Sequence, residues 1–70
     1  MEQPVIDNWF TYHAPSGDQL TTYAKLRTAA LEFANAINAL VPDCADKTAA
    51  IRKVREAVMT ANAAVACGGK

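Results

Sequence analysis

The chain has 70 residues, of which 51% are hydrophobic, and its seven basic residues balance seven acidic ones. This length allows a single domain, and the neutral charge balance argues against a nucleic-acid polymer as partner. There is no apolar run of about eighteen residues and no basic-then-apolar leader, so we expect a cytosolic protein with no membrane partner.

Residues 1–17 differ in composition from the rest and are expected to form an aromatic arm, followed by a helical hairpin over residues 18–70. Pro4, Pro15 and Gly17 argue against a long helix in the arm. The arm therefore belongs to the single domain as an extension.

The aromatic residues of the arm suit two different roles. Trp9 and Phe10 are expected to pack onto the hairpin. Tyr12 has a ring with a polar tip and stands beside His13 and near Pro15, which suits a partly exposed platform for base stacking. No second His, Cys or carboxylate stands at the sequence spacing of metal ligands from His13, so we expect no metal site.

The first helix is predicted from residue 18 to about residue 40, because Pro42 cannot continue it. Ser16 or Asp18 can cap its first turn. Its apolar side chains fall in two sectors of the helix surface, which indicates more than one neighbour. The main sector holds Tyr23, Leu26, Ala30, Phe33, Ala34 and Ile37, and the second holds Leu20 and Leu31.

The second helix is predicted over residues 47–66, an Ala-rich stretch without Gly or Pro. Asp43 or Asp46 is expected to cap it, and Gly68 and Gly69 to end it. One face carries apolar residues at the helical period and is wider than one partner helix can cover. This face comprises Ala50, Ile51, Val54, Ala57, Val58, Ala61, Ala64 and Val65.

These features predict an all-α fold in which two antiparallel helices, joined by a short turn, complete their core by assembling with copies of the same chain. The two cysteines, Cys44 and Cys67, would lie about 35 Å apart along a straight helix. A disulfide needs Cα atoms within about 7 Å, so we expect two free thiols in a reducing compartment.

No catalytic constellation is visible, so an enzyme and a cofactor are not expected. Arg27, flanked by Lys25 and Thr28, together with Tyr12 on the arm, makes up a minimal set for holding a nucleotide through phosphate contacts and base stacking. From the pattern alone, an intersubunit salt bridge of Arg27 and a packing role of Tyr12 are equally supported.

Three stretches, FTYHAPSGDQ (10–19), YAKLRTAALEFA (23–34) and REAVMTANAAVA (55–66), resemble the small phage anti-CBASS sponge proteins. The resemblance implies helix hairpins that assemble into homohexamers and bind cyclic dinucleotides such as cGAMP in the cytoplasm of the infected bacterial host. Sequestering this messenger without degrading it would keep the cell-killing effector inactive.

Carried over to this chain, the resemblance implies that Tyr12 stacks on a base and that the neighbouring His13 is also a ligand-binding residue. Arg27, or else Lys25, would contact the phosphates, and Thr28 would add a hydrogen bond. Some members of the family also hold cyclic trinucleotides at a separate site near the end of the second helix, through a basic residue. This chain departs from that pattern with Cys67 at about that place and Lys70 as the nearest cation.

Two other classes of function compete with this interpretation. A structural or adaptor oligomer without a small ligand would account equally well for the wide Ala-rich faces. A small DNA-binding regulator is disfavoured by the zero net charge and the scattered basic residues.

Overall fold

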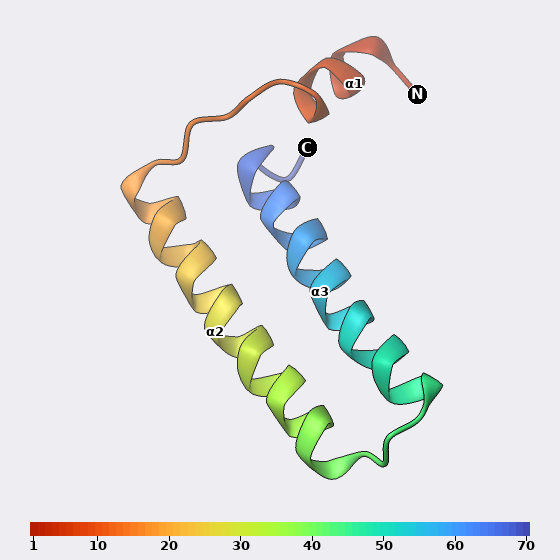
Figure 1. Cartoon of the computed structure of the whole chain (residues 1–70). Coiled ribbons are helices and arrows are strands. Elements are labelled where there is room, and N and C mark those ends of the chain that lie inside the picture. The colour runs from red at the N-terminus through yellow and green to blue at the C-terminus, as the bar shows by residue number, and fades with distance from the viewer.

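In a computed structural model that describes residues 1–70, the chain is entirely helical. The helices are α1 (Gln3–Trp9), α2 (Gly17–Leu40) and α3 (Ala45–Ala66). Helices α2 and α3 run antiparallel and side by side, while α1 lies over the open end of this pair, where both chain termini are found (Figure 1). The expected all-α hairpin is confirmed, and α1 is an addition to it.

The short helix α1 forms within the stretch for which the sequence predicted only an arm. Pro4 lies in its first turn, where the missing N–H needs no intrahelical partner. The helix ends at Trp9, and the Phe10 N–H donates to the Ile6 carbonyl at 3.1 Å. Residues 10–16, which we call the linker, then connect α1 to α2 without a helix or strand.

Helix α2 begins with a reciprocal capping box. The Gln19 N–H donates to the Ser16 hydroxyl at 3.4 Å, and the Gln19 side-chain amide oxygen accepts from the Ser16 N–H at 3.1 Å. Ser16 is therefore the N-cap, and Asp18 lies in the first turn. The helix ends where Val41 adopts extended backbone before Pro42, as the sequence predicted.

Helix α3 begins two residues earlier than predicted, and its N-cap is Cys44. The prediction that Asp43 or Asp46 would be the cap is wrong. Asp46 lies within the first turn, where its charge favours the helix N-terminus. Asp43 lies just outside the helix, and its carboxylate accepts a hydrogen bond from Lys47 at 2.8 Å.

Helix α3 ends in two glycines, as predicted. The Gly69 N–H donates to the Ala64 carbonyl at 2.9 Å and the Gly68 N–H to the Val65 carbonyl at 3.2 Å. This is the Schellman arrangement, and it requires the left-handed backbone that Gly68 adopts at φ 67°.

The two long helices meet along one seam of half-buried side chains, and no residue of the chain is fully buried. Phe33, Ala57 and Ala64 were expected on the seam, but they are exposed, because the actual contact is narrower than the apolar faces. The seam consists of Gln19, Tyr23, Leu26, Ala30, Ala34, Ile37 and Val41 from one side, and Lys47, Ala50, Ile51, Val54, Val58, Ala61, Asn62, Val65 and Ala66 from the other.

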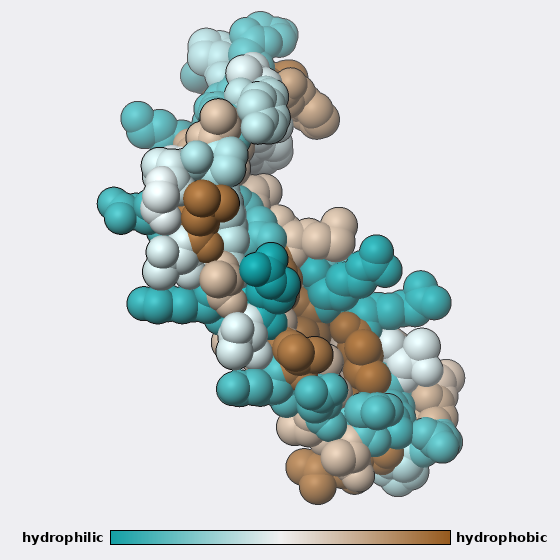
Figure 2. Space-filling view, turned by 60° about the vertical axis from the view of Figure 1, so that its left-hand side comes forward, coloured by the Kyte–Doolittle hydropathy of each residue, from teal (hydrophilic) through white to brown (hydrophobic).

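The molecule is a thin layer, with extents of 44 × 30 × 14 Å. A single layer of two helices leaves both of its broad sides uncovered, and apolar side chains emerge among polar ones on the surface (Figure 2). Leu31, Phe33 and Met59 are each 60% exposed. No helix has the length and apolar character that crossing a membrane would require.

Candidate functional site

The linker is held at both of its ends by side-chain amides that donate to the last turn of α3. The Asn8 amide donates to the Cys67 carbonyl at 3.3 Å, and the Gln19 amide donates to the Val65 carbonyl at 3.2 Å. The Cys67 carbonyl lies past the end of the helical ladder and is available to accept. The Val65 carbonyl already accepts from the Gly68 N–H and takes the Gln19 bond on its second lone pair. The segment that carries the aromatic residues is therefore attached to one end of the hairpin.

Further contacts join α1 and the linker to the same end. The backbone carbonyl of Asn8 accepts from His13 Nε2 at 2.7 Å and from the Cys67 thiol at 3.8 Å. The Trp9 indole N–H donates to the carbonyl of Lys70 at 3.2 Å. Asn8 is thus the residue through which α1, the linker and the end of α3 are joined.

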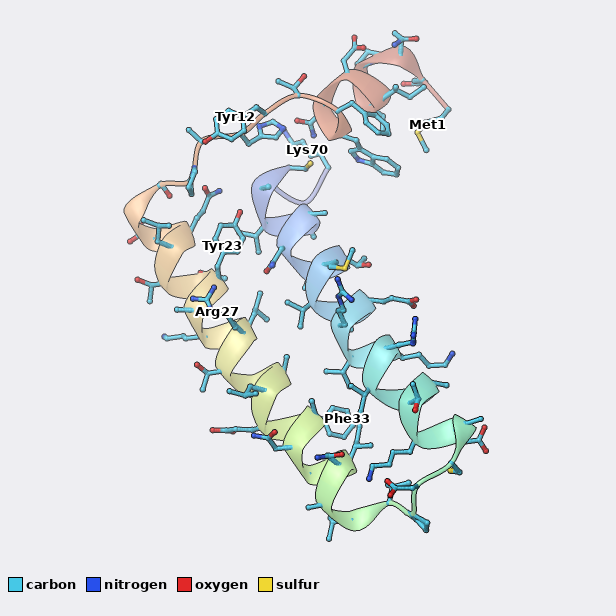
Figure 3. All side chains as sticks on the ribbon, viewed as in Figure 1. Met1, Tyr12, Tyr23, Arg27, Phe33 and Lys70 are labelled. Carbon is cyan, nitrogen blue, oxygen red and sulfur yellow. The ribbon has the colours of Figure 1, made fainter.

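Tyr12 lies on the linker with its side chain 84% exposed, and no hydrogen bond from its hydroxyl is found within the chain (Figure 3). Trp9 and Phe10 were expected to pack onto the hairpin. Phe10 is 85% exposed and Trp9 half-exposed, so this packing is incomplete within a single chain. Three aromatic rings therefore stand near one end of the hairpin, and that of Tyr12 is available for stacking.

Arg27 lies on α2, ten residues after the start of the helix and so about 15 Å along its axis. It is one turn beyond Tyr23 on the same side of α2 (Figure 3). The one salt bridge of the chain joins Lys47 and Asp43, so Arg27 has no acidic partner within the chain. The guanidinium is exposed and free to bind an anion.

Tyr12 and Arg27 do not meet within one chain. Figure 3 shows Tyr12 on the linker, beyond the end of α2, and Arg27 well inside that helix. Both side chains are exposed, and no contact between them is found. A ligand that contacts both residues would therefore have to take them from two copies of the chain or span a considerable distance.

Lys25 lies on a different side of α2 from Arg27, because residues two apart on a helix are separated by about 200°. Lys25 and Thr28 line a shallow concavity of about 360 Å³ on the outer face of α2. Glu32 lines the same concavity, and its carboxylate opposes a phosphate there. The structure therefore groups Thr28 with Lys25 rather than with Arg27.

A groove of about 590 Å³ lies between α1 and the last turns of α3. Trp9 and Phe10 line it from one side, and Met59 and Ala63 from the other. Met59 and Ala63 lie on the side of α3 that faces away from the seam. The groove therefore joins the aromatic end of the molecule to an uncovered apolar face.

No group of three or more His, Cys, Asp or Glu side chains gathers in the way that a metal ion requires. Both cysteines are free thiols, with Cys44 and Cys67 at opposite ends of α3.

The anchors of the linker were not identified from the sequence. For Gln19 a partial signal existed, since Ser16 followed three residues later by Gln is the pattern of a capping box, which places Gln19 at the start of α2 but does not indicate its bond to Val65. For Asn8 no local signal exists, because its partner Cys67 is 59 residues away in the chain.

A family model described as the hairpin domain of Acb2/Tad1 matches residues 2–66. Comparisons with curated proteins and with solved structures gave no match. The family match covers α1, the linker, α2 and α3, and it includes the bonds of His13 to Asn8 and of Gln19 to Val65. The bonds that Asn8 and Trp9 make with Cys67 and Lys70 extend beyond it. The chain therefore belongs to the Acb2/Tad1 hairpin-domain family, the anti-CBASS sponge family that its three sequence motifs resemble.

Proposed function

We propose that this protein binds and sequesters cyclic dinucleotides in the cytoplasm of an infected bacterial host and so blocks the activation of CBASS effectors. Family membership over residues 2–66 is the observation that carries this proposal. The exposed ring of Tyr12 and the exposed guanidinium of Arg27 supply the stacking and phosphate contacts that such a ligand needs.

The binding site is formed by two subunits of a homo-oligomer, with Tyr12 from one and Arg27 from the other. The separation of the two residues within one chain supports this arrangement. It agrees with a chain that buries none of its 70 residues and leaves Leu31, Phe33 and Met59 uncovered. The family resemblance suggests a hexamer.

Arg27 is preferred to Lys25 as the phosphate ligand. Lys25 shares its concavity with the carboxylate of Glu32, whereas Arg27 has no acidic neighbour within the chain. Thr28 lies on the Lys25 side of α2. It would contact the ligand only if the ligand, held by the neighbouring subunit, extended around α2 to that side. His13 contributes to the site through the linker, by its bond to the Asn8 carbonyl.

A second site for cyclic trinucleotides has less support in this chain. Cys67 stands where the resemblance implies a basic residue, and its carbonyl and thiol are both bonded to Asn8. Lys70 is the cation nearest to this place, and its carbonyl accepts from Trp9. A separate titration with a cyclic trinucleotide tests this site independently.

Isothermal calorimetry of the purified protein with a panel of cyclic dinucleotides tests the proposal. We expect saturable binding, and chromatography of the heat-denatured complex should recover the cyclic dinucleotide intact. Absence of binding across the panel would favour the structural or adaptor oligomer, and recovery of linear nucleotide would indicate a phosphodiesterase.

A further inference from the structure

Tyr12 stands between two residues whose side chains both bond back to the end of α1. The Thr11 hydroxyl donates to the Asp7 carbonyl, and His13 Nε2 donates to the Asn8 carbonyl at 2.7 Å. Asp7 and Asn8 lie in the last turn of α1, where carbonyls have no intrahelical partner. With its two neighbours held against α1, Tyr12 is left with its ring turned outward, in agreement with its exposure of 84%.

The bond from His13 attaches the linker to Asn8, which is itself bonded to the end of α3. A carbonyl oxygen can only accept, so the Nε2 atom of His13 must carry the proton. The same Asn8 carbonyl accepts from the Cys67 thiol, and the Asn8 amide donates to the Cys67 carbonyl. His13 thus attaches the residue next to Tyr12 to a junction that is itself fixed on the hairpin.

We propose that His13 is a positioning residue, which holds the linker on Asn8 and so sets where the Tyr12 ring meets the ligand. This inference rests on the proposed function. It assigns His13 a role through the backbone, in place of a direct contact with the nucleotide. The imidazole is half-buried and its Nε2 atom is already bonded within the chain, whereas the ring of Tyr12 is open to solvent.

When the linker is released from Asn8, the Tyr12 ring occupies many positions, and only a fraction of them allow it to stack on the base. The apparent dissociation constant rises by the inverse of that fraction. Loss of one neutral hydrogen bond therefore predicts about two- to tenfold weaker binding. A residue that stacks on the base directly would have a larger effect.

Two substitutions at the same position separate the role of the donor from that of the ring. His13→Phe keeps a flat ring and removes the donor. His13→Gln places an amide N–H at nearly the reach of imidazole Nε2, so it can still donate to the Asn8 carbonyl. Calorimetry should show the two- to tenfold loss for His13→Phe and affinity within about twofold of wild type for His13→Gln.

The decisive measurement is a double-mutant cycle with Tyr12→Ala. If His13 acts through Tyr12, His13→Phe should cause no further loss of affinity once the Tyr12 ring is absent. An equal loss in both backgrounds would mean that His13 touches the ligand itself, and the inference would be overturned. Unchanged affinity of His13→Phe in the wild-type background, or failure of His13→Gln to restore it, would also overturn the inference.

A ligand-free measurement keeps this test separate from that of the proposed function. Backbone order parameters of residues 10–16, measured by NMR, should fall below about 0.6 in His13→Phe and stay near the wild-type values in His13→Gln. If the wild-type protein binds no cyclic dinucleotide, the proposed function fails, while equal order in all three proteins refutes the tethering role of His13.

Discussion

Asn8 and Cys67 are bonded to each other in both directions, although they are 59 residues apart in the chain. The Asn8 amide donates to the Cys67 carbonyl at 3.3 Å, and the Cys67 thiol donates to the Asn8 carbonyl at 3.8 Å. Because Cys67 is the C-cap of α3, this pair attaches α1 to the end of the hairpin. The N-terminal helix is thereby a fixed part of the molecule that presents the linker.

We predict that Asn8→Ala loosens α1 from the hairpin and lowers the free energy of unfolding by about 0.5–1.5 kcal/mol, the net contribution of one hydrogen bond. Trp9, the one tryptophan of the chain, adjoins the substituted residue and reports on this contact. Urea unfolding followed by Trp9 fluorescence measures the change. Gln3→Ala is a matched control, since Gln3 bonds only to Asp7 within α1. Equal stability of Asn8→Ala and wild type would show that the pair does not hold α1.

A second prediction concerns the pH dependence of stability at the start of α3. The hydrogen bond from Lys47, together with its positive charge, lowers the pKa of Asp43 below its ordinary value of 3.8. A carboxyl whose pKa is lowered by folding stabilises the protein above its unfolded pKa, and this contribution is lost as the pH falls through the folded pKa. Wild type should therefore exceed Asp43→Asn in stability at pH 6, with the difference vanishing toward pH 2.

Urea midpoints of both proteins between pH 6 and pH 2 measure this difference. Because Asp43 is exposed, we expect a small effect that decreases with added salt. Glu32→Gln is the control, since Glu32 is an exposed carboxylate in the middle of α2 and has no salt bridge. A difference that grows as the pH falls would contradict the assignment.

The local features of the fold could be predicted from the sequence, whereas the contacts between distant segments could not. Ser16, Pro42 and Gly68 each act within a few residues of themselves, and all three mark helix ends where they were expected. Phe33 was assigned to the seam because a helical wheel gives the direction of a side chain but not the width of the contact. It is 60% exposed.

In the candidate site, too, local features could be predicted from the sequence and contacts between distant segments could not. From its ring chemistry and its neighbours, Tyr12 was expected to be partly exposed, and it is 84% exposed. Lys25, Arg27 and Thr28 are close in sequence, but the helix turns Lys25 and Arg27 to different sides. The role of Asn8 depends on a partner at the other end of the chain, which no local pattern indicates.

The third prediction is that the protein is a homo-oligomer that dissociates when charge is placed on the exposed apolar sector of α2. Leu31 is 60% exposed, and Leu20 lies on the same side three turns earlier. Burying an unpaired carboxylate is costly, so Leu31→Glu should shift the assembly toward smaller species. Ala29→Glu adds the same charge on the outer face, where Ala29 lines the same concavity as Lys25, and should assemble normally.

Multi-angle light scattering measures the mass of each protein against the chain mass of 7.5 kDa. A well-folded wild-type monomer at micromolar concentration would rule out the oligomer. Equal masses for wild type and Leu31→Glu would instead show that this sector remains exposed in the assembly, and Phe33 on the other flank would then be the next position to test.

The last prediction assigns different physical roles to Tyr12 and Arg27 in cyclic dinucleotide binding. Stacking of a base on an aromatic ring contributes about 1–3 kcal/mol, so Tyr12→Ala should weaken binding roughly ten- to a hundredfold. A charge-assisted hydrogen bond to phosphate contributes about 1.5–3 kcal/mol, so Arg27→Ala should cost a similar factor. Of these two variants, Arg27→Ala alone removes a charge, so it should also reduce the salt dependence of binding, whereas Tyr12→Ala should not. Lys25→Ala is the matched control, since it removes the same charge from the opposite side of α2, and its affinity should be unchanged.

Each variant is measured by calorimetry at two salt concentrations, alongside its mass. Dissociation of Arg27→Ala would mean that Arg27 forms an intersubunit ion pair, whereas an intact Arg27→Ala oligomer with undiminished affinity would transfer the phosphate contact to Lys25.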